Sequence, residues 1–71
     1  MNPTIPPNIR VISIVLTVLG YTVRGAYNDK RYDLYHNRSY RSTLAYFRDY
    51  TRRLSSDGTR FVASSKPVKT V

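Results

Sequence analysis

An uncharged apolar run from Val11 to Val23 narrows the folds open to this chain more than any other feature. Up to Val23 the only charged side chain is that of Arg10. From Arg24 onward there are eleven Lys and Arg against four Asp, and the chain contains no Glu. The chain therefore divides into two chemically different segments, an apolar segment 1–24 and a basic segment 25–71. Such asymmetry favours a membrane or a nucleic acid as partner.

The apolar segment is predicted to be a transmembrane helix. Thirteen helical residues span only about 20 Å, less than the roughly 30 Å hydrocarbon core of a bilayer. Extending the helix back to Thr4 gives about twenty residues, with Arg10 close enough to the headgroups to snorkel. Tyrosines near the C-terminal end of the run are of the residue type that lies at the interface between membrane and water. The residues expected to flank the membrane are Arg10, Arg24, Tyr21 and Tyr27, and Ile12, Val15, Leu16 and Leu19 would form a lipid-facing or helix-facing stripe.

Two other interpretations of the same run stay open. A buried strand or core helix is one of them, because a short β-branched run cannot be assigned by its period alone. A secretory signal peptide is the other, since its apolar stretch has a similar length. The basic n-region of a signal peptide is missing, and no small-residue cleavage site follows the run.

The basic segment 25–71 is predicted to hold one amphipathic helix over about 40–55. Its apolar positions follow a 4-3-4-3 spacing, which places them on one helical stripe: Tyr40, Leu44, Phe47, Thr51 and Leu54. Ser39 or Ser42 can cap the start, and Gly58 suits a left-handed stop. The opposite face carries Arg41, Arg48, Asp49 and Arg52. The stretch 25–39 is predicted to be a loop, and 59–71 an extended tail.

The fold class predicted from these elements is mainly α, with one N-terminal transmembrane helix, a short amphipathic helix, an extended C-terminus and no independent globular core. A chain of 71 residues without cysteine is marginal as an isolated domain, so a partner or a membrane is expected to stabilise it. The partner-docking residues would be Tyr40, Leu44, Phe47 and Leu54, with Arg52 and Arg53 pairing to acidic groups on a neighbour.

The residue types exclude most catalytic chemistry. There is no Glu or Cys, one histidine (His36) and three glycines, so we expect no catalytic residues, no cofactor, no metal site and no small-molecule substrate. Interleaved arginines and tyrosines raise a second interpretation, in which arginine neutralises phosphates and tyrosine stacks on bases. The same two residue types also dominate protein–protein hot spots. Nucleic acid therefore ranks below a protein complex in a lipid bilayer as the expected partner.

The layout resembles the MWFE family of small single-span accessory subunits of mitochondrial respiratory complex I. The positions that carry the resemblance are Ile5 and Pro7 before the run, Gly20 near its end, Arg52-Arg53-Leu54-Ser55 and Phe61-Val62. The Met-Trp-Phe-Glu opening of that family is replaced by Met-Asn-Pro-Thr, and the stretch 25–40 has no clear counterpart. The MNLL type of complex I subunit is similar over Gly25 to Lys30 and over Asn37-Arg38-Ser39.

The resemblance implies a non-catalytic, single-pass subunit of the mitochondrial inner membrane. Such a subunit would support the assembly and stability of the membrane arm of NADH:ubiquinone oxidoreductase, while electron transport occurs on other subunits. The alternative function is a small basic RNA-binding subunit of a ribosome or another ribonucleoprotein.

Overall fold

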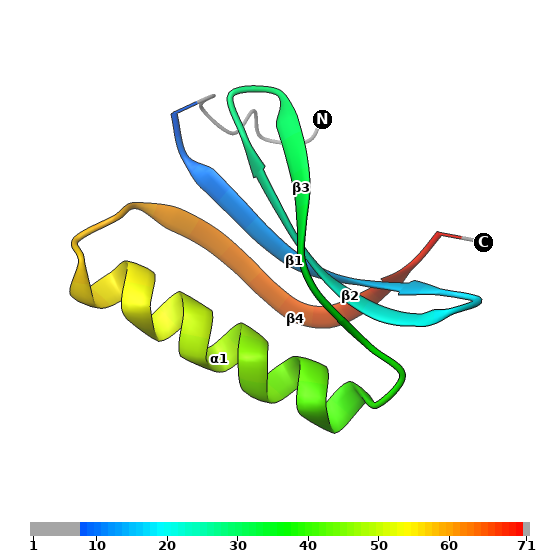
Figure 1. Cartoon of the computed structure of the whole chain (residues 1–71). Helices are drawn as coiled ribbons and strands as arrows, with labels where there is room; N and C mark the ends of the chain where they lie inside the picture. The colour runs from blue at the N-terminus through cyan, green and yellow to red at the C-terminus, as the bar shows by residue number, and fades with distance from the viewer. Residues whose placement is uncertain (1–7, 71) are drawn as a thin grey trace.

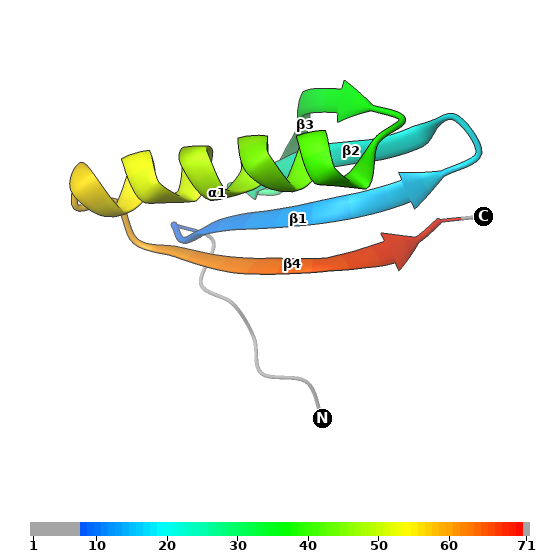
Figure 2. The same ribbon diagram turned by 90° about the horizontal axis from the view of Figure 1, so that it is seen from below.

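The computed structural model describes residues 8–70, which form a four-stranded sheet with one helix packed on it (Figure 1). The elements are β1 (Arg10–Thr17), β2 (Gly20–Tyr27), β3 (Lys30–Asn37), α1 (Tyr40–Ser56) and β4 (Phe61–Lys69). The sheet order is β3-β2-β1-β4, with β4 parallel to β1 and the other neighbours antiparallel. Helix α1 covers one face of the sheet, and no described element covers the other (Figure 2).

The predicted transmembrane helix is wrong, because the apolar run forms β1, a turn and the first half of β2. β1 lies between two other strands, and side chains alternate between the two faces of a strand. Ile12 and Ile14 point toward α1 and are almost fully buried, whereas Val11, Ser13 and Val15 lie on the uncovered face. Apolar residues on both faces produce the unbroken run. The predicted alternative of a buried strand is the one that the structure contains.

Between residues 8 and 70, no helix combines the length and the apolar content that crossing a membrane requires.

The stretch predicted to be a loop contains the second half of β2, a tight turn and β3. Asn28 and Asp29 form that turn with φ angles of 52° and 63°. Two left-handed central residues match the right-handed twist of a hairpin, and Asn and Asp tolerate this conformation better than most residues. The boundary drawn at residue 24 falls inside β2. Ile5 and Pro7, two of the positions that carried the resemblance, lie outside the described residues.

Helix α1 begins and ends with local signals that the sequence displays. Ser39 is extended, with φ −86° and ψ 124°, and its side chain accepts a hydrogen bond from the Ser42 amide at 3.3 Å. Gly58 takes a φ of 74° after the last turn, and the Thr59 amide donates to the Leu54 carbonyl at 2.9 Å. These are the serine N-cap and left-handed C-terminal stop expected of a helix that ends near residue 56.

The prediction of no independent core is also wrong. Three sheet residues and two helix residues form one buried cluster, in which each side chain is at most 8% exposed: Ile12, Ile14, Val23, Phe47 and Leu54. Tyr40 and Leu44 pack against the edge of this cluster. The four apolar residues predicted to dock on a neighbouring protein therefore face the sheet of their own chain. A mostly β, two-layer domain replaces the mainly α arrangement that the sequence predicted.

Strand β4 contains an irregularity that limits its free edge. Ser64 pairs with Ser13 and Val68 with Val15, so Ser65, Lys66 and Pro67 lie opposite Ile14 alone. The Tyr40 hydroxyl donates to the Ser65 carbonyl at 2.9 Å and ties this bulge to the start of α1. Proline has no amide hydrogen to offer, and a bulge bends the strand, so both features discourage pairing with another sheet.

Candidate nucleic-acid interface

The outer face of α1 carries a row of exposed arginines. Arg41, Arg48 and Arg52 are exposed there, and we call these three residues the helix arginine row. At about 3.6 residues per turn, positions seven and eleven residues after the first lie within about 20° of it around the axis. Their spacing along the axis is about 10 Å and then about 6 Å. The row therefore presents three guanidinium groups on one line of the helix.

The row follows from the packing of the opposite face. Thr43, Phe47 and Leu54 are buried against the sheet, so residues on the far side of the helix must face solvent. The Thr43 hydroxyl donates to the Ser39 carbonyl at 2.9 Å, which satisfies this polar group inside the core. The sequence had placed Arg41, Arg48 and Arg52 on the face opposite the apolar stripe. Their arrangement in space agrees with that expectation.

Acidic residues do little to neutralise the row. The one acidic residue of α1, Asp49, forms a salt bridge of 2.9 Å with Arg53, four positions along the helix. Within residues 8–70, no salt bridge involves Arg41, Arg48 or Arg52. Arg53 was predicted to pair with an acidic group on a neighbouring protein, but in the domain it already pairs with Asp49. Arg52 is exposed on the outer face of α1.

The tyrosines on α1 are engaged inside the protein. Tyr46 stacks on Tyr35 of β3 with a centroid distance of 4.6 Å and an interplanar angle of 9°. Tyr46 also stacks with Tyr50 at 6.1 Å and 10°. Ring faces that contact one another are not free to receive bases. Recognition through α1 would therefore depend on phosphate contacts rather than on the base stacking that the interleaved sequence suggested.

The four residues predicted to flank a membrane contact other parts of the domain. The Arg10 guanidinium lies 5.0 Å from the centroid of the Tyr27 ring, and Tyr21 packs against Tyr40 at 5.2 Å. The Arg24 Nε donates to Asp33 Oδ1 at 3.0 Å across β2 and β3. These side chains therefore hold neighbouring strands and α1 together.

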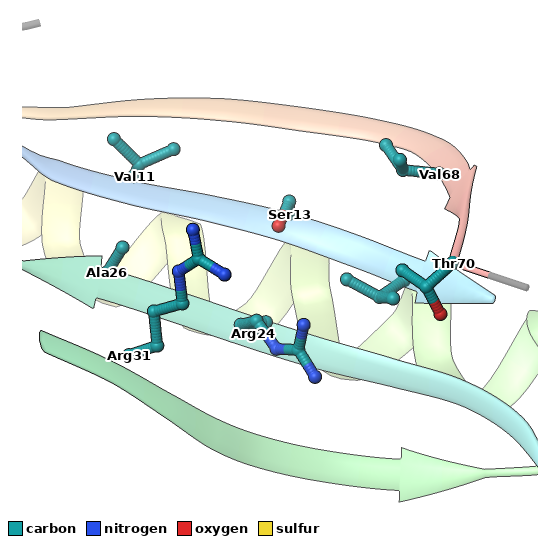
Figure 3. A pocket seen from close by; sticks show the side chains of 8 residues that line it. Val11, Ser13, Arg24, Ala26, Arg31, Val68 and Thr70 are labelled. Carbon is teal, nitrogen blue, oxygen red and sulfur yellow. The ribbon is translucent and has the colours of Figure 1, made fainter. Parts of the chain in front are cut away.

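A second basic surface lies on the uncovered face of the sheet. A shallow hollow of about 300 Å³ has an aliphatic floor and two guanidinium groups on one side (Figure 3). Its lining residues are Val11, Ser13, Val15, Arg24, Ala26, Arg31, Val68 and Thr70. Arg24 already pairs with Asp33, which leaves Arg31 as the arginine of the hollow without an acidic partner among residues 8–70.

Sequence reasoning missed the hollow because it treated 25–39 as a loop. The alternation of β2 and β3 was the signal that could have revealed it, since Arg24, Ala26 and Arg31 share one face once the strands pair. No three side chains of the metal-ligating types gather anywhere in the described part of the chain. The arrangement can hold anions on a fixed surface, and we derive no covalent chemistry from it.

Comparisons with protein-family models, with curated proteins and with solved structures find no significant match. The resemblance to the MWFE subunits thus stays a prediction. The N-terminal helix that it implied is absent from the described residues, which form strands there.

Proposed function

We propose that this protein is a non-catalytic nucleic-acid-binding module that holds duplex phosphates along the outer face of α1. The observation that carries the proposal is the helix arginine row, whose three residues form no salt bridge with any described residue. Arginine suits this role because its guanidinium forms paired hydrogen bonds to phosphate oxygens and stays charged. The formal net charge of +8 adds a long-range attraction for any polyanion.

The accessory-subunit hypothesis stays a prediction, and the described residues supply no helix that could span a membrane. It required an N-terminal span in the mitochondrial inner membrane and a helix docked on another subunit. The structure uses the apolar run as strands and packs the apolar stripe of α1 on its own sheet. The RNA-binding alternative needs neither feature, and a backbone-reading surface serves duplex RNA or duplex DNA through the same phosphate chemistry.

The experiment that tests this function is a salt titration of binding. Fluorescence anisotropy would follow binding to a labelled duplex of one sequence, prepared once as DNA and once as RNA. Each neutralised phosphate contributes about −0.9 to the slope of log K against log salt on B-DNA. Three arginines predict a slope of about −2.7, with dissociation constants of roughly 10⁻⁴ to 10⁻⁶ M at physiological salt. Comparing the dissociation constants of the RNA and DNA duplexes shows whether the row binds A-form phosphates more tightly than B-form phosphates.

Two double variants separate the row from net charge alone. Arg48→Gln with Arg52→Gln removes two positive charges from the row and should make the slope shallower by about 1.8. Lys30→Gln with Lys66→Gln removes two exposed charges that belong neither to the row nor to the hollow, and should leave the slope nearly unchanged. Absence of binding at low salt would contradict the proposal. Equal losses in the two variants would contradict it too, because they would reflect net charge rather than a site.

A further inference from the structure

The turn that joins β1 and β2 exposes two large aliphatic side chains at the end of the molecule. Val18 is 84% exposed and Leu19 is 69% exposed, the two highest values among the exposed large hydrophobic residues described. We call Val18 and Leu19 the hairpin tip. In a domain this small, which has few apolar residues available for its core, two adjacent ones in water require an explanation.

The geometry of the turn does not provide that explanation. The other hairpin uses Asn28 and Asp29 at its centre, the residue types that favour a tight turn. In the β1–β2 turn, the Leu19 amide donates to the Thr17 hydroxyl oxygen at 3.2 Å. Gly20 supplies the unusual φ of 130°. Thr17 and Gly20 therefore shape the turn, and the side chains of Val18 and Leu19 add nothing to it.

Basic residues from two other segments lie beside the hairpin tip. The backbone of Arg38 contacts Gly20, and a Cβ placed on Gly20 would lie 3.0 Å from the Arg38 Cα. Lys69 pairs with Leu16 at the end of β4, and the Thr70 amide donates to the Leu16 carbonyl at 3.1 Å. The β1–β2 turn, the β3–α1 loop and the end of β4 gather at the same end of the domain (Figure 1).

The acidic residues lie elsewhere. Asp29 is in the β2–β3 turn and Asp57 follows the end of α1, both at the opposite end of the domain (Figure 1). Asp33 and Asp49 lie within β3 and α1 and are paired with Arg24 and Arg53. Within residues 8–70, the end that carries the hairpin tip therefore combines exposed aliphatic side chains with two basic residues, Arg38 and Lys69, that form no salt bridge.

From this combination we propose that the hairpin tip docks the protein on an anionic phospholipid surface. Val18 and Leu19 insert at the boundary between headgroups and acyl chains, and Arg38 and Lys69 contact the phosphates. Aliphatic side chains lose contact with water there, while basic side chains remain hydrated beside anionic lipid. A second copy of this chain is a poor occupant, because its own net charge of +8 would repel the same surface.

This docking leaves two residues of the helix arginine row, Arg48 and Arg52, available. Arg48 lies nine residues beyond Ser39, about 14 Å along the axis of α1 from the end that faces the lipid. That distance exceeds the Debye length of about 8 Å at physiological salt. Arg48 and Arg52 therefore contribute little to lipid binding and can be replaced separately, whereas Arg41 lies in the first turn of α1, at the end that faces the lipid. The inference goes beyond the proposed function and does not depend on it.

The strength expected of this contact is modest. Burying each aliphatic side chain strengthens binding by about tenfold or more, and each basic residue near anionic lipid by about fivefold. The total is comparable to that of a single myristoyl chain, which binds membranes reversibly. Half-binding is therefore expected at roughly 0.1–1 mM accessible lipid.

Two vesicle measurements on the full chain test the proposal. Because the sequence has no tryptophan, Leu19→Trp introduces a single tryptophan at the hairpin tip, whose emission can be followed apart from that of the tyrosines. Its emission should shift to shorter wavelength on phosphatidylcholine vesicles that contain about one-third phosphatidylglycerol, and not on pure phosphatidylcholine. A tryptophan at Ser56, near the opposite end, should show no shift. In cosedimentation, Val18→Ser with Leu19→Ser should weaken binding about one hundredfold, while Arg48→Gln with Arg52→Gln should leave it within about twofold.

Three results would overturn the docking proposal. The first is no binding of the unaltered chain to the anionic vesicles. The second is equal binding by the serine double variant, which would mean that the hairpin tip does not insert. The third is a loss of duplex binding rather than vesicle binding in that variant, which would assign the hairpin tip to nucleic acid. None of these results changes the expected salt slope of the helix arginine row.

Discussion

Replacing Phe47 with alanine tests whether α1 is held by its own sheet or by another protein. Phe47 is 6% exposed and belongs to the cluster that also contains Ile12, Ile14, Val23 and Leu54. Truncating a buried phenylalanine costs about 3–5 kcal/mol. A domain of this size has a total stability of about 4–11 kcal/mol, taking about 0.05–0.15 kcal/mol per residue. The substitution should therefore remove about a quarter of that stability or more.

Urea unfolding followed by far-ultraviolet circular dichroism measures this loss on the purified chain. With a denaturant slope near 1 kcal/mol per M, as expected for a small domain, the midpoint should fall by about 3 M or more. Leu44→Ala on the same helix is the matched comparison, because Leu44 is only half-buried and should cost roughly 1–2 kcal/mol. If Phe47 instead served to dock on another subunit, the isolated chain would unfold at the same urea concentration with or without it. A midpoint within about 0.5 M of the unaltered protein would refute the packing described for α1.

Two further substitutions test local features of the fold. Gly20→Ala should destabilise the domain more than Gly58→Ala in thermal unfolding: the new Cβ at Gly20 would lie 2.9 Å from the Asn37 carbonyl oxygen, whereas nothing lies within 4 Å at Gly58, and equal losses would contradict the close approach. Ser39→Ala removes the side chain that accepts from the Ser42 amide and should cost about 1 kcal/mol, and Ser39→Asp should restore most of that stability. An unchanged melting temperature in Ser39→Ala would show that Ser39 does not cap α1.

The helix was the most predictable element, because its signals are local. Its apolar spacing, the serine before it and the glycine after it are visible in consecutive residues, and the structure has α1 at Tyr40–Ser56. The helix arginine row could be inferred from the same spacing. What the spacing could not reveal was the partner of the apolar stripe, because that partner is a sheet formed by strands that were not predicted.

Strand β3 was missed because its sequence lacks an apolar face. Lys30, Arg31, Tyr32 and Asp33 are all exposed, so the first half of this edge strand has little burial pattern to detect. Its turn residues, Asn28 and Asp29, fell in the stretch predicted to be a loop, although they form the centre of a hairpin. The pairing of Arg24 with Asp33 and the stacking of Tyr35 on Tyr46 depend on this strand. Neither interaction could be inferred without its register.

The misleading strength of the apolar run has a specific physical origin. β1 is an interior strand, and the first half of β2 adds the buried Val23, so apolar residues are expected in both strands. Two consecutive strands are normally recognised in a sequence by the polar turn residues between them, and here the turn carries Val18 and Leu19 instead. Had those positions been Asn and Gly, the run would have divided into two short segments typical of a hairpin. The two residues that joined the strands into one unbroken run, Val18 and Leu19, are thus ones that the fold leaves in water. The fluorescence of Leu19→Trp on anionic vesicles therefore tests whether these two residues, which do not belong to the core, are the part of the chain that contacts lipid.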